Sequence, residues 1–180
     1  MPPSSTRRKT ATHRIASRSA AASGLNLSRF LPYRLSVLSN TISQTVARLY
    51  EKRFHITIPE WRIIAVLGGL GGETLSAGEI ATATAMDKVQ VSRAISRMLD
   101  SELILREAGD TDRRKALLTL TAKGQEIYRE IAPLALAYEA RLTSALDDDE
   151  LQQLNLLLGK LQIQADELTT APEQRMTGVG

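Results

Sequence analysis

The chain has 180 residues, of which 43% are hydrophobic, and this is enough for one globular domain with a sizeable core. The absence of cysteine excludes disulfides and thiolate chemistry, and two histidines give no basis for a metal site or a cofactor. No apolar run approaches the roughly 20 residues that are needed to span a bilayer. The net charge of +3 is uneven, with +8 in residues 1–50, zero in 51–120 and −5 in 121–180. We therefore expect a cytoplasmic protein with no membrane contact and a basic N-terminal segment that can attract phosphate.

The first segment, residues 1–25, is rich in Ser, Thr, Ala and Arg and has no sustained apolar face. We interpret it as a flexible basic tail, which is either a solvated leader or an arm that contacts DNA or a ligand. From about residue 28 to 52, apolar residues recur every three or four positions, which predicts an amphipathic helix with Pro32 in its first turn. A second helix is predicted from about Pro59 to Gly68-Gly69, where we expect the glycines to stop it.

Two helix-start signals follow at the spacing of a helix-turn-helix. Ser76 and Glu79 form the pattern of a capping box, in which each side chain bonds the backbone N–H of the other residue. The pattern repeats eleven residues later with Asp87 and Gln90. The predicted helices span two ranges, about 77–83 and 88–101. Two short helices joined by a tight turn are the geometry that places the second helix in the DNA major groove.

The second of these helices has two distinct faces. At about 100° per residue, Val91, Ile95, Met98 and Leu99 fall on one side, which we expect to be the core face. The residues of this helix predicted to contact DNA are Lys88, Val89, Gln90, Ser92, Arg93, Ser96 and Arg97. Ser76, which precedes the first of the two helices, is also predicted to contact DNA. Gln90 suits adenine, Arg93 suits guanine or a phosphate, and Arg97 is placed for the DNA backbone. The alternative is a charged face that is merely solvated.

A β-hairpin is predicted after this helix, with strands of about 103–108 and 115–120. Its loop carries Asp110 and Asp112 beside three adjacent cations, Arg113, Arg114 and Lys115. A hairpin in this position is a wing, and one arginine at its tip could enter the narrow minor groove. The alternative is a soluble turn with a local ion pair, which contributes about 0–1 kcal/mol when exposed.

Two long helices are predicted at the C-terminal end, the first capped by Thr121 and kinked at Pro133, the second opening at Asp147 with four consecutive acids. The second carries one apolar stripe, formed by Leu151, Leu154, Leu157, Leu158, Leu161, Ala165 and Leu168. Because the winged unit accounts for its own core, we expect the terminal helices to cover a second subunit. The predicted organisation has four regions. A basic flexible tail covers 1–25, a helical dimerisation region covers 26–57 and 122–170, a winged helix-turn-helix domain covers 58–121, and a flexible C-terminus covers 171–180.

The sequence resembles the MarR family of bacterial winged-helix regulators from about Ser28 to Leu168. The resemblance rests on five stretches: Ile58-Pro59-Glu60-Trp61-Arg62, Leu75-Ser76-Ala77-Gly78-Glu79-Ile80-Ala81, Asp87-Lys88-Val89-Gln90-Val91-Ser92-Arg93, Asp110-Thr111-Asp112-Arg113-Arg114, and Leu117-Leu118-Thr119-Leu120-Thr121. It implies a mainly helical fold with a small hairpin wing, a homodimer that binds a palindrome in double-stranded DNA, and a small-molecule effector that alters the spacing of the two reading heads. Sensing through cysteine is excluded by composition.

The stretch Leu27–Leu35 further resembles regulators of aromatic-acid catabolism, some of which respond to aryl-CoA thioesters. The resemblance implies an effector site between the dimerisation helices and the winged unit, at Tyr33, Arg34, Val37, Trp61 and Arg62. An arginine there could pair with a carboxylate or a CoA phosphate, and an aromatic ring could stack on the ligand. The alternative is that Trp61 is a core aromatic and the arginines are surface charges.

The resulting expectation is a ligand-controlled transcriptional repressor rather than an enzyme. Catalysis finds little support, because the two histidines lie in the tail and near a helix end, and Gly68–Gly72 lacks the lysine and the strand context of a phosphate-binding loop. Two other interpretations use the same fold, a nonspecific DNA-packaging protein and a helical protein-interaction adaptor. A large ratio of specific to random binding would separate direct readout from charge neutralisation.

Overall fold

The computed structural model describes residues 24–108 and 116–170, and the chain divides into two compact units, residues 1–38 and 39–180. The described part of the first unit is an exposed turn followed by the start of helix α1 (Leu31–Phe54). In that turn the Asn26 side-chain oxygen accepts hydrogen bonds from the Ser28 N–H and hydroxyl at 3.1 and 2.7 Å. The predictions of flexible ends at 1–25 and 171–180 fall almost wholly outside the described residues.

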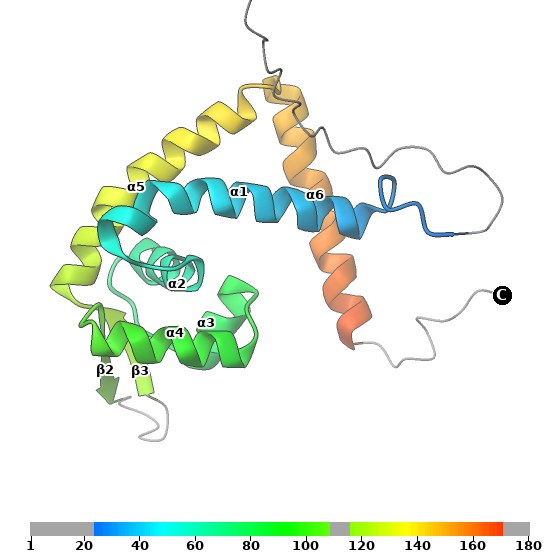
Figure 1. The fold of residues 1–180 in the computed structure, drawn as a ribbon. Coiled ribbons are helices and arrows are strands. Elements are labelled where there is room, and N and C mark those ends of the chain that lie inside the picture. The colour runs from blue at the N-terminus through cyan, green and yellow to red at the C-terminus, as the bar shows by residue number, and fades with distance from the viewer. Residues whose placement is uncertain (1–23, 109–115, 171–180) are drawn as a thin grey trace, which may run out of the picture. The chain divides into compact units, whose positions relative to one another are not determined.

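The second unit holds the rest of α1 and the remaining elements, which are mainly helical with a small antiparallel sheet (Figure 1). In chain order these are α2 (Ile58–Gly69), β1 (Leu75–Ser76), α3 (Ala77–Thr84), α4 (Lys88–Asp100), β2 (Ile104–Ala108), β3 (Ala116–Leu120), α5 (Ala122–Thr143) and α6 (Asp148–Thr170). The predicted fold class is confirmed, and the expected helices and hairpin strands lie within about three residues of these bounds.

Side chains at the helix starts explain why the elements begin where they do. The Ser76 hydroxyl accepts the Glu79 N–H at 3.3 Å while the Glu79 carboxylate accepts the Ser76 N–H at 2.7 Å, so the predicted capping box opens α3. The Asp87 carboxylate opens α4 by itself, accepting the Val89 and Gln90 N–H groups at 2.9 and 2.8 Å. The second box is therefore an aspartate cap without the reciprocal bond from the Asp87 N–H to the Gln90 side chain that the pattern predicted.

The sheet contains a strand that was not predicted from the sequence. Its order is β1-β3-β2, and Leu75 of β1 pairs with Leu118 of β3 while Ser76 pairs with Leu117. The predicted hairpin is present, with β2 and β3 antiparallel from the Ile104–Leu120 pair to the Ala108–Ala116 pair. A two-residue strand has no alternation to detect, so only its partner could identify it.

One apolar core joins α1, α2, α3, α4, the sheet and α5. Figure 1 shows α3 and α4 beside α2, with β2 and β3 at the C-terminal end of α4. The largest side chains that are almost completely buried are Tyr50, Ile63, Ile64, Leu67, Ile80, Met98, Leu118, Ile131 and Val91. Because this core includes Met98 and Val91 of α4, it fixes which face of that helix is left in solvent.

Helix α2 ends at Gly69, as predicted, and Gly68 has a packing role in addition. Gly68 and Gly69 lie inside the last turn of α2, and a Cβ at Gly68 would overlap the ring of Tyr128 on α5. The chain leaves the helix only afterwards, where Gly71 and Gly72 take positive φ angles of 67° and 110°. The absence of a side chain at Gly68 therefore permits α2 and α5 to approach closely.

Helix α6 differs from the other long helices because none of its residues is buried. Leu151 is partly buried, and the other large apolar side chains of α6 are 41–63% exposed: Leu154, Leu156, Leu157, Leu158, Leu161, Ile163 and Leu168. Pro133 lies inside α5, whose helix continues to Thr143, and the predicted kink there stays a prediction. Among the described helices, none combines the length and apolarity needed to cross a membrane.

Candidate nucleic-acid interface

The outward face of α4 is a polar and basic surface held on a buried apolar face. Val91, Ile95 and Met98 are buried as predicted, together with Ala94, while Leu99 is partly buried. The predicted contact residues of this helix are all exposed: Lys88, Val89, Gln90, Ser92, Arg93, Ser96 and Arg97. Val89 is 58% exposed and lies among these polar residues. This face can therefore offer cations, an amide, hydroxyls and an apolar contact to a partner.

A groove of about 500 Å³ runs beside this face and brings in a residue that the sequence pattern did not single out. Its polar lining consists of Lys88, Ser92 and Ser96 from α4 and Arg106 from β2. The signal that could have found Arg106 is strand alternation, because it lies two residues after the buried Ile104 and so shares the face of β2 that packs against α4. Two cations and two hydroxyls along one groove form a surface suited to an anionic backbone.

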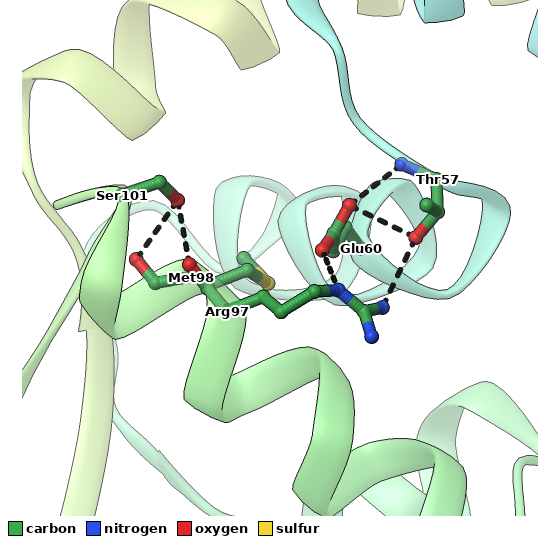
Figure 2. A network of polar contacts seen from close by, with 5 residues as sticks. All are labelled: Thr57, Glu60, Arg97, Met98 and Ser101. Carbon is green, nitrogen blue, oxygen red and sulfur yellow. Dashed lines mark hydrogen bonds and ion pairs between the residues drawn. The ribbon is translucent and has the colours of Figure 1, made fainter.

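Two of the predicted contact residues are already bonded within the protein. The Ser76 hydroxyl is held by Glu79, donating to its carboxylate at 2.6 Å and accepting its N–H. The Arg97 Nε donates to the Glu60 carboxylate at 2.7 Å, and its NH2 group lies 3.5 Å from the Thr57 hydroxyl (Figure 2). The structure thus gives Arg97 a partner in α2, where helical position had assigned it to the DNA backbone.

Glu60 is the buried half of this ion pair, with a side chain 7% exposed against 50% for Arg97. Its second carboxylate oxygen accepts the Thr57 N–H at 2.6 Å and the Thr57 hydroxyl at 2.9 Å. Burial alone would raise the pKa of Glu60, but the hydrogen bonds from Thr57 and Arg97 and the positive charge of Arg97 hold it below its ordinary value of 4.5. The carboxylate is therefore ionised at neutral pH and joins the start of α2 to α4.

The three cations predicted at the tip of the wing, Arg113, Arg114 and Lys115, lie outside the described residues. The strands that flank them pair as far as Ala108 and Ala116. The hairpin that would carry them is therefore present, and their contacts stay a prediction.

The predicted effector residues fall in both units. Tyr33, Arg34 and Val37 are exposed on the first part of α1. In the second unit, the partly buried Trp61 packs against Tyr50 with ring centroids 5.6 Å apart, and Arg62 donates to the Ser43 hydroxyl at 3.4 Å. Trp61 thus belongs to the layer around the core, which is the alternative considered for it from sequence.

Tyr50 is the other notable polar group in this region. Its hydroxyl is buried and has no hydrogen-bond partner among the described residues. Burial raises the pKa of Tyr50 to about 12, with the negative charge of the neighbouring Glu51 adding to the shift. In the described parts of the chain, no group of three or more His, Cys, Asp or Glu side chains is placed to hold a metal ion.

Comparison with known proteins places this geometry among DNA-binding regulators. The model of the MarR family matches residues 56–115. The transcriptional regulator MgrA of Staphylococcus aureus is 27% identical over 136 residues, covering 76% of this chain and 90% of MgrA. The crystal structure of a MarR family regulator from Silicibacter pomeroyi is 30% identical with a TM-score of 0.66, covering 76% of this chain and 89% of that one. A MarR/EmrR family regulator from Acinetobacter is 29% identical with a TM-score of 0.72, covering 79% of this chain and 99% of its own.

Proposed function

Because the chain belongs to the MarR family of DNA-binding transcriptional regulators, we propose that it is a repressor that binds a palindromic operator as a homodimer and is released by a small molecule. The observation that carries the proposal is the exposed face of α4, where Lys88, Gln90 and Arg93 lie opposite a face that is buried in the core. Such a helix can enter the major groove without disturbing the core that supports it.

In this proposal, the residues of α4 divide between base contacts and backbone contacts. Gln90 and Arg93 lie on the N-terminal half of the helix and would contact base edges, the amide on adenine and the guanidinium on guanine. Lys88, Ser92, Ser96 and the additional cation Arg106 line the adjacent groove and would bind phosphates. The wing residues Arg113, Arg114 and Lys115 would add contacts in the minor groove.

The apolar surface of α6 supports a homodimer. A helix of 23 residues with seven large apolar side chains at least 41% exposed, five of them on the predicted stripe, is unfavourable in water, at about 25 cal/mol for each Å² of apolar surface left uncovered. A second copy that covers this helix would bury the stripe and place two α4 helices for the two halves of a palindrome. Sedimentation of the wild-type protein and of a Leu157→Asp, Leu161→Asp variant tests this, with a monomeric wild type contradicting it.

The proposed effector is an aromatic acid or its CoA thioester. Tyr33, Arg34, Val37, Trp61 and Arg62 are the residues proposed to bind it, with the arginines facing a carboxylate or phosphate and the rings stacking on the aromatic group. Release would follow from a higher affinity of the ligand for the dimer that does not fit the operator, because a ligand shifts an equilibrium only by its differential affinity.

The test is binding to duplex DNA measured by fluorescence anisotropy. A specific duplex, selected by the wild-type protein from a random pool, and a scrambled duplex of equal length are titrated at several salt concentrations, with and without a panel of aromatic acids and their CoA thioesters. Specific binding at least about 1,000 times tighter than scrambled binding supports a sequence-reading regulator. Equal affinity for both duplexes would instead identify a nonspecific architectural protein.

Two substitutions assign the contacts within that assay. Arg93→Ala is expected to weaken specific binding and relax the base preference at one position, whereas Arg114→Ala is expected to weaken all duplexes to a similar extent. If neither substitution changes the footprint, the proposed interface is wrong. Ligand binding that is equally tight with and without operator would rule out the proposed mechanism of release.

A further inference from the structure

The ion pair between α2 and α4 suggests a role for Arg97 that differs from DNA contact. Arg97 lies four residues after Arg93 on the exposed side of α4, so its position alone favours a phosphate contact. Its guanidinium, however, is directed to the first turn of α2, where the Nε bonds the Glu60 carboxylate at 2.7 Å (Figure 2). Arg93 has no such partner among the described residues and is free to meet DNA.

The partner of Arg97 is itself firmly fixed. The two oxygens of Glu60 bond different groups, since one accepts both hydrogen bonds from Thr57 and the other accepts the bond from Arg97. Thr57 is the N-cap of α2 and lies three residues after the end of α1, next to the buried Ile56. The carboxylate therefore connects α4 to the junction between α1 and α2.

Such a connection matters because apolar packing fixes which face of α4 is buried but supplies no directional contact to its exposed side. The contacts of α4 with the core through Ala94 and Met98 are non-directional, whereas the ion pair adds a charge-assisted hydrogen bond of defined direction between the exposed side of α4 and the start of α2. Base readout needs side chains placed to within about 0.5 Å. The end of α4 is also secured, since Ser101 donates its hydroxyl to the Arg97 carbonyl at 2.8 Å.

We propose that Arg97 is a positioning residue, which together with Glu60 and Thr57 fixes the recognition helix to the α1–α2 junction and so sets the register of Gln90 and Arg93 on the bases. The inference rests on the proposed function, since it concerns how α4 is aimed at DNA. Its distinctive consequence is that the buried Glu60, which is not exposed enough to meet DNA, controls sequence discrimination.

Glu60→Gln isolates the contact with α4. The amide oxygen can still accept both bonds from Thr57, while the amide NH2 group then faces the Arg97 guanidinium, so that two donors oppose each other. Arg97→Met removes the other partner and keeps the aliphatic stem on the surface of the helix. Arg93→Met is the matched control, because it makes the same change one turn earlier at an exposed residue that is proposed to contact DNA.

The experiment measures the affinity of each variant for the selected and scrambled duplexes as a function of salt. We expect Glu60→Gln and Arg97→Met each to weaken selected-duplex binding about tenfold, with scrambled-duplex binding within about twofold of wild type and an unchanged salt slope. The double variant should lose no more than either single variant, since both remove one interaction. Arg93→Met should reduce the salt slope by about one.

The inference is overturned if Arg97→Met lowers the salt slope, or if Glu60→Gln leaves discrimination unchanged. If Glu60→Gln melts below the assay temperature, Arg97→Met decides alone, because its side chain is half exposed and its loss is compatible with folding. Failure of the proposed function gives a different result: no duplex is selected from the pool, and Arg93→Met has no effect on discrimination.

Discussion

Replacing Gly124 with alanine is expected to destabilise the protein, although alanine is the better helix former. Gly124 is the third residue of α5, and a Cβ there would overlap the carbonyl oxygen of Leu103 and lie 3.1 Å from the Leu120 side chain. That carbonyl cannot withdraw freely, because it accepts the Thr121 N–H at 3.1 Å, while the Thr121 hydroxyl donates to the neighbouring Glu102 carbonyl at 2.7 Å and lies 3.2 Å from the Leu103 oxygen. The added methyl group must therefore displace backbone that is fixed on both sides.

The magnitude follows from three contributions. Overpacking a filled site costs about 1–3 kcal/mol, weakening the hydrogen bonds to the Leu103 carbonyl costs about 1 kcal/mol, and the higher helix propensity of alanine returns about 1 kcal/mol. The expected loss in the free energy of unfolding is about 2 kcal/mol, which lowers the melting temperature by about 4–8 °C for a chain of this size.

Urea denaturation followed by circular dichroism measures this loss, with all variants at one protein concentration because a dimer gains stability with concentration. Gly159→Ala is the matched control, since Gly159 lies inside α6 with nothing within 4 Å of an added Cβ and on the side away from the leucine stripe. The control is expected to gain up to about 1 kcal/mol. A Gly124→Ala variant as stable as wild type would show that the contact with Leu103 does not constrain this position.

Three further predictions concern residues with strained, unpaired or charged groups. Ala85 ends α3 at a left-handed φ of 51°, so Ala85→Gly should raise the free energy of unfolding by about 1 kcal/mol in urea denaturation, and a loss would contradict strain at this turn. Tyr50→Phe removes an unpaired buried hydroxyl and should stabilise the protein by about 1 kcal/mol. It should also make the fall in stability between pH 10 and about 12 smaller than in wild type, because only the unfolded chain ionises Tyr50 there. A destabilised variant would mean that the hydroxyl has a partner. The pKa of Glu60 is lowered in the folded protein, so its stabilising contribution is present above the ordinary value of 4.5 and is lost as pH falls through the folded pKa. The difference in the free energy of unfolding between wild type and Glu60→Gln should therefore shrink in acid, and a constant difference from pH 7 to 3 would refute this.

The local rules for starting helices explain why so much of the fold is predictable here. Ser76, Asp87 and Thr121 each bond N–H groups within three residues, so their effect depends on neighbours in the chain alone. The spacing of apolar residues in α4 likewise predicts which side is buried, because the helical repeat fixes it. These signals predicted the mainly helical fold, the hairpin and the exposed face of α4.

Features that depend on distant partners were missed. The strand β1 exists only through its pairing with β3, and the reason for glycine at position 68 is the ring of Tyr128, 60 residues away in the chain. Strand alternation places Arg106 on the same face of β2 as Ile104, but only the packing of β2 against α4 brings that face to the groove. In each case the decisive interaction links residues that are far apart in sequence.

Arg97 shows most clearly what each level determines. The sequence alone determined that it lies on the polar side of a capped helix, because helical periodicity and capping are local properties. Only the tertiary structure decided where its charge goes, since Glu60 comes from another helix, 37 residues earlier, and burial of that carboxylate makes a fixed cation its favourable partner. Secondary structure and the polarity of each face follow from neighbours along the chain, whereas the partner of a long charged side chain is chosen by packing.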